Sequence, residues 1–389
     1  MGLGHLRRNL LIARELSDSS LDPELLWITG THEARFFDVP EHVDCLSLPA
    51  LHKRADGSYR PRRLRGSLSE LIALRAAILR SALERFRPDV LLVDTVPRGA
   101  LGELDDSLRA LRRAGTACVL GLRDIGDDPE VMHREWKRRR YNETIREFYD
   151  QVWIYGDVEV YDRVRAERMA PDVAAGAYYT GYLDQKARLR GLGERASDSG
   201  TAAPFVLCVV GGGQDGERLA ELFARTRFPR GLCGRLLTGP FMSLPTRRRL
   251  QALARERTDL EVIEFFPEPA ALVQRAESVV AMGGYNSVCE VLSFGKRALI
   301  VPRVSPRREQ LIRARRFSEL GLVDMLHPEQ ASSSRLRAWL DRRDAVPPDA
   351  RGLVDLNGLS RLPGLMRRAL APAAESSPRI DLSAPASAS

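Results

Sequence analysis

The apolar residues of this 389-residue chain alternate between two patterns. Residues 6–16, LRRNLLIAREL, carry apolar side chains three and four positions apart, which predicts an amphipathic helix. Residues 24–30, ELLWITG, form an apolar run that ends in glycine, which predicts a buried strand. Continuous apolar strands between helices are typical of a parallel sheet covered on both faces. The same alternation continues through helices 68–86 and 106–115 and strands 88–94, 116–124 and 151–157.

The alternation restarts after residue 204 and predicts a second unit of the same kind. Its predicted strands are 205–213, 233–240, 260–266, 277–284 and 297–303, and its predicted helices are 216–226, 244–257, 268–276, 286–295 and 308–321. We therefore predict an α/β fold with two Rossmann-like, doubly wound domains. Ligands of such sheets bind where the strands end, so the site should lie in a cleft between the domains.

Composition marks the domain boundaries. Residues 185–204 are polar and rich in Gly, Ala and Ser, so they read as a linker. We assign residues 1–184 to the first domain, 205–345 to the second and 346–370 to a helical extension. Residues 371–389 contain few large apolar side chains, and we expect them to be disordered.

The opening residues, MGLGHLRR, form a glycine-rich turn of the kind that normally follows a strand and opens a helix. A parallel sheet without its central first strand would leave backbone groups and apolar surface exposed. We therefore expect a strand of roughly ten residues, encoded upstream of Met1, to belong to the first domain.

Composition and cysteine usage narrow the class of protein. The apolar fraction of 44% and charged fraction of 29% are those of a soluble globular protein. No run approaches the roughly 20 apolar residues of a membrane helix, and no signal peptide is evident, so we expect a cytoplasmic location. The five cysteines are far apart and form no C-x-x-C pair, so we interpret them as core residues.

The net charge of +8 is concentrated in four arginine-rich segments, 52–66, 133–140, 246–257 and 306–316. These segments lack the interleaved aromatic residues and the motif spacings of nucleic-acid readers, so no specific nucleic acid is predicted. One interpretation is a set of solvated helix faces. Another is attraction to anionic substrates or to the inner face of an anionic membrane, which would allow peripheral membrane contact.

Two glycine turns of the second domain follow strands and open helices. Gly211, Gly212 and Gly213 end the first strand, where free N–H groups can hold a diphosphate, although such turns are also ordinary in α/β proteins. Residues 279–303, VVAMGGYNSVCEVLSFGKRALIVPR, are more specific. They resemble the nucleotide-sugar signature of GT-B glycosyltransferases, and especially the C-terminal domain of glycosyltransferase family 28, whose known member is the UDP-GlcNAc transferase of peptidoglycan synthesis.

The resemblance implies roles for particular residues. The glycine turn and helix start, Gly283, Gly284, Asn286 and Ser287, would hold the donor diphosphate. Glu290 would accept hydrogen bonds from the ribose hydroxyls, which suits a carboxylate. Its alternative role is only to favour the start of the helix electrostatically.

Further along the same domain, Glu309 and Gln310 correspond to the pair that contacts the donor sugar in the family. Their alternative role is a solvated helix start. Phe265 and Phe266 correspond to the residues that border the base, although at least one of them is expected in the core.

The resemblance also gives the opening turn a function. Family members carry a Gly-x-Gly-His loop after their first strand, and Gly2, Gly4 and His5 match it here. A histidine in this position can act as general base toward an acceptor hydroxyl, or can position phosphate or acceptor. Asp94, at the end of an apolar strand, can orient His5.

Arg123 and Asp124 follow another strand and suit an acceptor or a phosphate, although Asp94 and Asp124 can also serve as helix or loop caps. The basic loop at 51–66 would overhang the acceptor side, where its arginines can clamp an anionic or lipid-linked acceptor. No D-x-D metal motif stands at a clear strand end, with Gly126-Asp127-Asp128 the ambiguous case, so no metal and no cofactor are predicted.

These observations favour an inverting glycosyltransferase that uses a nucleotide-diphosphate sugar, with UDP and an N-acetylhexosamine favoured by the family, and a hydroxyl acceptor. One alternative is a nucleotide-sugar 2-epimerase or hydrolase with the same fold. Another is a non-catalytic protein that binds sugars or nucleic acid through its arginine-rich surface.

Overall fold

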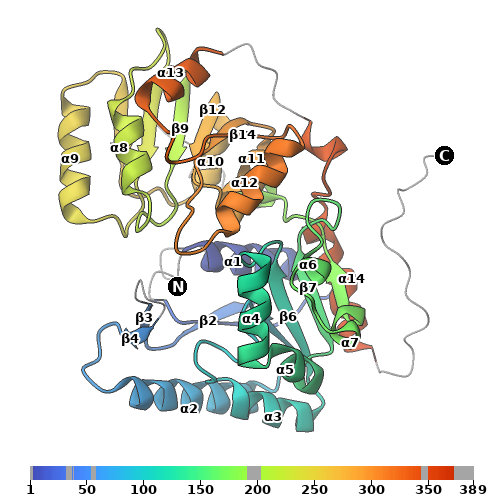
Figure 1. The fold of residues 1–389 in the computed structure, drawn as a ribbon. Helices are drawn as coiled ribbons and strands as arrows, with labels where there is room; N and C mark the ends of the chain where they lie inside the picture. The colour runs from blue at the N-terminus through green and yellow to red at the C-terminus, as the bar shows by residue number, and fades with distance from the viewer. Residues whose placement is uncertain are drawn as a thin grey trace.

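The computed structural model describes residues 3–31, 37, 39–53, 58–190, 203–342 and 349–371. Gly2, residues 191–202 of the predicted linker and residues 372–389 of the predicted disordered tail lie outside this part of the chain. The described residues form two α/β units, and α1 lies at their junction (Figure 1).

The elements of the first half follow the predicted alternation. Its strands are β1 (Leu25–Thr29), β2 (Val43–Ser47), β3 (Leu51–Lys53), β4 (Tyr59–Pro61), β5 (Val90–Asp94), β6 (Ala117–Arg123), β7 (Gln151–Tyr155) and β8 (Ala177–Tyr179). Its helices are α1 (Leu3–Ser17), α2 (Leu68–Phe86), α3 (Asp105–Ala114), α4 (Pro129–Arg139), α5 (Tyr141–Phe148), α6 (Arg163–Ala166), α7 (Pro171–Ala175) and the 3₁₀ helix η2 (Gln185–Leu189).

The second half contains β9 (Phe205–Val209), β10 (Cys233–Leu237), β11 (Leu260–Ile263), β12 (Ser278–Ala281), β13 (Arg297–Ile300) and β14 (Asp324–Met325). Its helices are α8 (Glu217–Arg225), α9 (Leu244–Arg255), α10 (Pro269–Arg275), α11 (Tyr285–Phe294), α12 (Glu309–Glu319), α13 (Ser333–Asp341), η4 (Ala350–Gly352) and α14 (Gly358–Leu370). Every strand and helix predicted between residues 205 and 321 is present.

Local sequence signals explain where several helices begin. Ser67 and Glu70 form a capping box before α2, in which each side chain accepts the other residue's backbone N–H. Asp128 caps α4 and Ser243 caps α9, each followed by proline in the first turn. Gly115 and Gly295 end α3 and α11 in the left-handed conformation that glycine adopts at little cost.

The second domain is built on a single parallel sheet with the strand order β11-β10-β9-β12-β13-β14. β9 and β12 pair in parallel, with Leu207 opposite Val279. Both strands are buried along their whole length, because helices cover the two faces of the sheet. This confirms the predicted doubly wound arrangement for this half.

The first domain differs from the prediction of one continuous sheet. β5, β6, β7 and β8 form a four-stranded parallel sheet, β1 and β2 form a separate parallel pair, and β3 and β4 form a hairpin. Within the described residues, β1 and β5 are not hydrogen-bonded to each other. Both strands line the same cavity.

The two halves share packing and chain connections. One apolar cluster contains Trp153 of β7, Phe205 of β9 and Leu362 of α14. The predicted linker begins as the packed helix η2, in which Gln185 and Arg188 are buried. After the second domain, α14 returns to the first and packs against α1 (Figure 1).

The cysteines are reduced, and three of the five occupy the predicted core positions. Cys118, Cys208 and Cys289 are buried, whereas Cys233 is partly exposed. The prediction is wrong for Cys45, which is exposed on β2. β2 pairs only with β1 among the described strands, so one of its edges is open.

A buried ion pair joins the two domains. Arg313 of α12 donates to both carboxylate oxygens of Asp124, with Nε–Oδ2 at 2.9 Å and Nη2–Oδ1 at 2.6 Å, and neither residue is more than 1% exposed. Tyr182 Oη donates to the same carboxylate at 3.2 Å, and the N–H of Ile125 donates at 2.8 Å. Both oxygens of Asp124 are therefore occupied at the domain contact, and its predicted role toward an acceptor or a phosphate stays a prediction.

Replacing Arg313 with methionine would leave this buried carboxylate without its cation. We expect the free energy of unfolding to fall by about 3–5 kcal/mol, measured by urea unfolding followed by tryptophan fluorescence. The matched control is Arg80→Ala, which removes an exposed pair with Glu84 and should leave the free energy of unfolding nearly unchanged. Equal stability of the wild type and Arg313→Met would contradict this role.

Candidate active site

A cavity of about 790 Å³ opens between the domains at the carboxyl ends of β5 and β6. The first domain contributes His5, Asp94 and Arg123 to its wall. From the second domain, the lining includes Gln214, Asp215, Phe241, Arg303 and Glu309. The structure therefore brings the predicted base, its predicted carboxylate partner and one predicted sugar-side residue into one cavity, at the edge where such sheets bind ligands.

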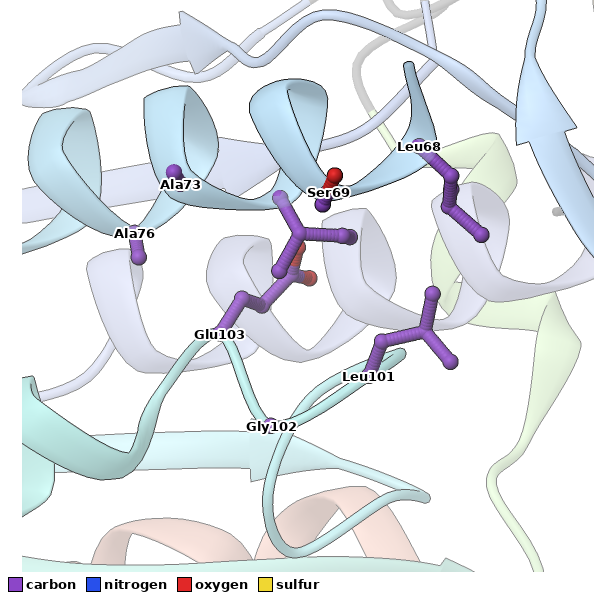
Figure 2. A pocket seen from close by; sticks show the side chains of 8 residues that line it. Leu68, Ser69, Ala73, Ala76, Leu101, Gly102 and Glu103 are labelled. Carbon is purple, nitrogen blue, oxygen red and sulfur yellow. The ribbon is translucent and has the colours of Figure 1, made fainter.

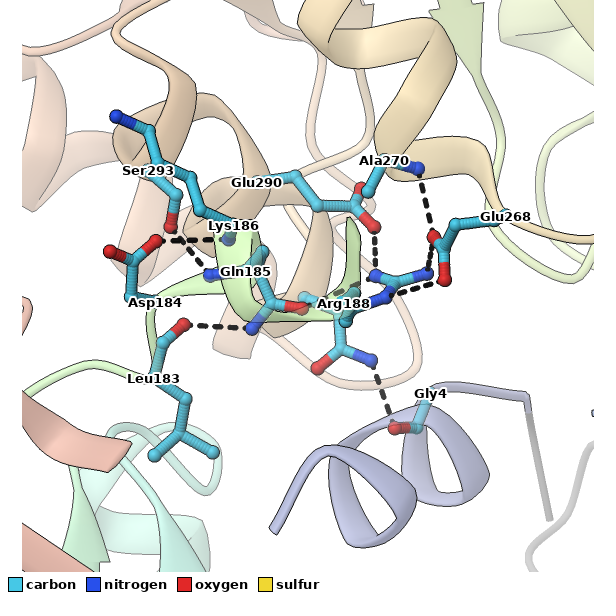
Figure 3. Close-up of polar contacts among 11 residues, drawn as sticks. Gly4, Leu183, Asp184, Gln185, Lys186, Arg188, Glu268, Ala270, Glu290 and Ser293 are labelled. Carbon is cyan, nitrogen blue, oxygen red and sulfur yellow. Dashed lines mark hydrogen bonds and ion pairs between the residues drawn. The ribbon is translucent and has the colours of Figure 1, made fainter. Parts of the chain in front are cut away.

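His5 lies in the first turn of α1, because the helix begins at Leu3 rather than at the predicted Leu6. Its Nδ1 is 2.6 Å from Oδ2 of Asp94, the last residue of β5. Gly4 contacts the second domain, since its carbonyl oxygen accepts a hydrogen bond from Asn286 Nδ2 at 2.9 Å (Figure 3). The start of α1 is thus held by both domains.

Arg8, one helical turn after His5, occupies the other oxygen of the same carboxylate. Its Nη2 donates to Asp94 Oδ1 at 2.6 Å, and the side chain is only 2% exposed. The guanidinium also lies 5.8 Å from the Tyr155 ring centre and 5.7 Å from that of Tyr285, within reach of cation–π attraction. Asp94 therefore aligns His5 and Arg8 together.

The surroundings of His5 favour a neutral imidazole. Burial lowers the pKa of His5, Asp94 opposes this, and the charges of Arg8 and Arg123 lower it further. Burial alone would raise the pKa of Asp94, but Arg8 and His5 outweigh it and hold that pKa far below its usual range. The short contact to the ionised carboxylate assigns the proton to Nδ1, which leaves Nε2 as a free base.

Two arginines near His5 form no ion pair with a carboxylate in the described part of the chain, although Glu290 and Glu268 favour the charge of Arg7, and Glu309 and Asp124 that of Arg123. Burial lowers the pKa of Arg7 to about 10 and that of Arg123 to about 10, with neighbouring arginines adding to both shifts. Both therefore remain cationic at neutral pH. The Nε atoms of both side chains are buried without a hydrogen-bond partner. The arrangement suits an anion that enters between the domains.

The glycine turn after β12 presents the start of α11 at the domain junction. Gly283 has φ of +83°, and a Cβ there would meet Ile300 at 2.8 Å, so only glycine fits without a shift. Gly284 is the N-cap of α11 and gives no side-chain cap, and Asn286 and Ser287 lie in the first turn. The uncapped N–H groups of this turn can bind a phosphate.

The glycines after β9 have a packing explanation that does not need a ligand. A Cβ on Gly213 would lie 2.4 Å from the carbonyl oxygen of Thr238, and Phe241 N–H donates to the carbonyl of Gly212 at 2.9 Å. The neighbouring loop therefore occupies the space beside this turn. Gly211 is exposed with φ of +62°. Diphosphate binding by Gly211, Gly212 and Gly213 stays a prediction.

Glu290 is buried and already paired. Its Oε1 accepts a hydrogen bond from Arg188 Nη1 at 2.5 Å, and Arg188 also pairs with Glu268 (Figure 3). Arg188 comes from η2, in the segment that the sequence predicted as a linker. A ribose hydroxyl would therefore meet a carboxylate whose charge is already compensated, and the ribose role of Glu290 stays a prediction.

Glu309 and Gln310 begin α12 and surround Arg303. The Arg303 guanidinium pairs with Glu309 and with Asp215, the latter at 2.9 Å, and the Arg303 N–H donates to Gln310 Oε1 at 3.0 Å. Glu309 is 5% exposed, and its second oxygen, Oε2, is buried without a hydrogen-bond partner. Because Glu309 lines the cavity, Oε2 is a free acceptor for a ligand hydroxyl.

Phe265 and Phe266 lie outside the cavity wall. Both are partly buried, and Phe266 packs against the apolar cluster shared by the domains. Neither is among the side chains that line the cavity. Their predicted contact with a base is therefore not supported by the arrangement of this cavity and stays a prediction.

The two acidic residues at 127 and 128 have structural partners. Asp127 accepts the Arg308 N–H at 2.6 Å, and Asp128 accepts the Glu130 N–H as the cap of α4. Asp128 also pairs with Arg308 at 3.1 Å. Among the residues that the structure describes, no group of three or more His, Cys, Asp or Glu side chains is arranged to hold a metal ion.

A second hollow lies away from the domain junction, between α2 and the loop before α3 (Figure 2). Its wall is mostly apolar, with Leu68, Ile72 and Leu101. Its single carboxylate, Glu103, is paired with Arg75 at 2.5 and 2.8 Å. The hollow therefore offers little chemistry compared with the cavity between the domains.

Sequence reasoning missed the arginines that hold the predicted acids. Three ion pairs join residues that are distant in sequence or lie on different elements. They are Arg8 with Asp94, Arg188 with Glu290 and Arg303 with Glu309. A spacing signal existed only for Arg8, which lies one turn after His5 on the same helix. The other two pairings depend on how separate elements pack.

Comparison with known proteins supports this description. Residues 206–347 match the family model described as glycosyltransferase family 28 C-terminal domain. Over 85 residues the chain is 34% identical to NDP-glycosyltransferase YjiC of Bacillus licheniformis. That stretch covers 22% of this chain and 21% of the relative, so the match spans about a fifth of the relative's length. The predicted resemblance to family 28 is confirmed for the second domain.

Solved structures extend the likeness to both domains. CalG4, the calicheamicin glycosyltransferase, is 17% identical with a TM-score of 0.61, and the match covers 97% of each chain. A UDP-GlcNAc 2-epimerase from Neisseria meningitidis bound to UDP-GlcNAc is 13% identical with a TM-score of 0.59, covering 94% of this chain and 96% of that one. These likenesses confirm the predicted GT-B fold. None of the described helices combines the length and apolar character needed to span a membrane.

The charges around His5 generate a prediction about its titration. We expect the His5 imidazole to titrate below 6.5, because burial and the two nearby arginines disfavour its cation. Arg8→Met removes one of those charges and frees Asp94 to favour the cation, so the pKa of His5 should rise. NMR titration of the imidazole C–H signals, assigned with His5→Gln, measures both values. A pKa unchanged by Arg8→Met would contradict the arrangement.

Proposed function

We propose that this protein is an inverting glycosyltransferase that moves a sugar from a nucleotide-diphosphate donor to a hydroxyl acceptor. The observation that carries the proposal is the His5–Asp94 pair, 2.6 Å apart, in a cavity shared with a glycosyltransferase family 28 C-terminal domain. The name of the relative YjiC, an NDP-glycosyltransferase, supports a nucleotide-diphosphate donor.

The first step assigned to the protein is removal of a proton from the acceptor. Nε2 of neutral His5 takes the hydroxyl proton as the acceptor oxygen attacks the anomeric carbon of the donor. Asp94 keeps the second proton on Nδ1 and stabilises the imidazolium that forms. The C–O bond to the diphosphate breaks as the new C–O bond forms on the opposite face, so one displacement inverts the anomeric centre.

The leaving nucleoside diphosphate needs compensation for its negative charge. The uncapped start of α11, after Gly283 and Gly284, offers N–H groups and the positive end of the helix dipole. Arg7 and Arg123 are partly buried cations that form no ion pair with a carboxylate among the described residues, and they lie near the same end of α1. We assign these groups to the diphosphate.

Recognition of the donor sugar is assigned to the start of α12. Glu309 lines the cavity and accepts a sugar hydroxyl through its unpartnered Oε2, while the ion pair with Arg303 holds the carboxylate in place. Gln310 has its carbonyl oxygen bound to Arg303 N–H, so its amide N–H₂ is the group left for the sugar. UDP-GlcNAc is the donor that we propose to test first, because the family and the epimerase complex both point to it.

The acceptor enters from the side of the β3–β4 hairpin. Arg62 follows this hairpin, lines the cavity and lies 5.8 Å from the ring centre of Phe241 in the second domain. An anionic acceptor would be attracted by Arg62 and by Arg307, which also lines the cavity. This placement supports an anionic or lipid-linked acceptor.

Removing the base should abolish transfer without removing the donor site. We expect His5→Ala and Asp94→Asn to lower kcat/KM by about 10²–10⁴-fold, because proton removal would fall to water. UDP affinity, measured by isothermal titration calorimetry, should stay within about twofold of the wild type. His327→Ala, in the second domain and outside the cavity, is the matched control. Full activity of His5→Ala would reject the proposed base.

An incubation without acceptor separates transfer from epimerisation and hydrolysis. UDP-GlcNAc is incubated with the wild-type protein without an acceptor, and the products are resolved by chromatography. An unchanged donor agrees with transfer. Release of free sugar or appearance of an epimer would replace the proposed function with a hydrolase or 2-epimerase of the same fold.

Glu290 provides a test of the donor orientation. Glu290→Gln should weaken UDP binding by about tenfold, because a neutral amide accepts the two ribose hydroxyls less well than a carboxylate. Glu268→Gln is the matched control, since it removes the other carboxylate of Arg188 but no proposed ligand contact. Isothermal titration calorimetry with UDP compares the two. Equal losses in both variants would make Glu290 a structural residue.

A further inference from the structure

The helix that carries the proposed sugar-binding residues begins without a cap of its own. α12 starts after Arg308, whose side chain makes no capping hydrogen bond, and Glu309 and Gln310 are its first two residues. In a capping box, a glutamate or glutamine three residues after the N-cap accepts the N–H of the N-cap residue. Leu311 stands in that position here and offers no side-chain acceptor. The N–H of Arg308 therefore needs an acceptor from another part of the chain.

The first domain supplies that acceptor. Asp127, in the loop between β6 and α4, accepts the Arg308 N–H at Oδ1 over a distance of 2.6 Å. Asp127 is only 3% exposed, so the bond lies in surroundings that strengthen it. A carboxylate at the start of a helix also interacts favourably with the helix dipole. The first turn of α12 is thus capped from the other domain, by a residue 181 positions earlier in the chain.

The loop that presents Asp127 is held firmly inside the first domain. Glu167 Oε1 accepts the Gly126 N–H at 3.2 Å. Arg163 donates to Glu167 at 2.9 Å and also to the carbonyl of Arg123, and both members of this ion pair are buried. A Cβ on Gly126 would lie 2.7 Å from Glu167 Oε1, so the backbone packs directly against the pair. Asp127 therefore caps α12 from a fixed support.

Side-chain pairs join the same two segments beside the cap. α4 and α12 lie in different domains, next to the junction between them (Figure 1). Arg308 pairs with Asp128 at 3.1 Å, and Arg307 lies 3.5 Å from Glu135 of α4. Both pairs are partly exposed and contribute little by themselves. The bond to the buried Asp127 is therefore the contact that fixes the start of the helix.

The capped turn holds the groups that we assign to the donor sugar. Glu309 lines the cavity and has a buried oxygen, Oε2, without a hydrogen-bond partner. Gln310 accepts the Arg303 N–H at 3.0 Å. Because both residues directly follow the capped residue, loss of the cap would let the first turn fray and would displace both side chains. A group that must be re-ordered before it binds contributes less affinity.

We propose that Asp127 is a positioning residue for donor-sugar recognition. From the first domain it fixes the first turn of α12, and with it the groups of the second domain that bind the sugar. The inference rests on the proposed function, in which Glu309 and Gln310 contact the sugar. The sugar site is then complete only while the domains are docked, because the cap and the capped helix belong to different domains. The nucleoside diphosphate is assigned to other groups, including the start of α11, and does not need this cap.

Binding measurements on variants separate the sugar from the nucleotide. We expect Asp127→Ala to weaken UDP-GlcNAc binding about fivefold to tenfold, as for a lost helix cap, and to change UDP binding by less than about twofold. Asp127→Asn keeps a side-chain oxygen as acceptor and should restore most of the affinity. Asp162→Ala is the matched control, because Asp162 caps α6 within the first domain and does not line the cavity. Isothermal titration calorimetry measures both ligands.

The two ligands also distinguish failure of this inference from failure of the proposed function. A wild type that does not bind UDP-GlcNAc would reject the proposed donor, and the inference about its sugar with it. If the wild type binds both ligands, an equal loss of both in Asp127→Ala, or a loss of neither, would overturn the positioning role alone.

Hydrogen exchange followed by NMR tests the cap without any ligand. In Asp127→Ala the amides of Arg308 and Ile312 should exchange at least about tenfold faster than in the wild type, whereas that of Phe317, later in α12, should be unchanged. Ile312 N–H donates to the carbonyl of Arg308 at 3.0 Å, so it reports on the first turn. Unchanged exchange of both first-turn amides would overturn the proposal even if sugar binding is weakened.

Discussion

The relation between the two domains depends on one buried guanidinium. Arg313 donates to both oxygens of Asp124 in the other domain, and its third nitrogen, Nη1, donates to the carbonyl of Gly283 at 3.1 Å. Desolvation of both charges is offset only while the two domains stay in contact, because separation would leave either charge alone. The same contact fixes the glycine turn that begins α11, so domain docking and the geometry of the proposed diphosphate site share one side chain.

Three other carboxylates of the candidate site are also paired with arginines. Asp94, Glu290 and Glu309 are each held by a buried or partly buried arginine, namely Arg8, Arg188 and Arg303. Arg8 and His5 together hold the pKa of Asp94 far below its usual range, and Arg188 and Arg303 hold their carboxylates in place by ion pairs. Arg7 and Arg123 break this arrangement, since no carboxylate among the described residues pairs with them. The excess positive charge therefore collects where the two domains meet, which is the place that an anionic substrate would enter.

The sequence allowed the second domain to be predicted well, because its strands are continuous apolar runs and its glycine turns are close in sequence to the helices they open. The pairing of His5 with Asp94 was predicted from the strand end expected before His5 and the strand end at Asp94, although the 88 residues between them say nothing about distance. The ion pair of Asp124 was not predictable, because the local sequence of a carboxylate at a strand end is the same whether it faces solvent or an arginine 189 residues later. Polar composition likewise concealed that Arg188 is a buried anchor rather than part of an exposed connection.

Because α14 returns to the first domain, the chain passes between the two domains twice. These two crossings run side by side. Leu183 and Asn357 form an antiparallel bridge, Tyr182 N–H donates to Asp355, and Gly358 N–H donates to Tyr182. Two crossings joined by backbone hydrogen bonds act as a single double-stranded hinge and resist twisting of one domain against the other. Residues beside the crossings are thereby held in register by backbone hydrogen bonds from both segments.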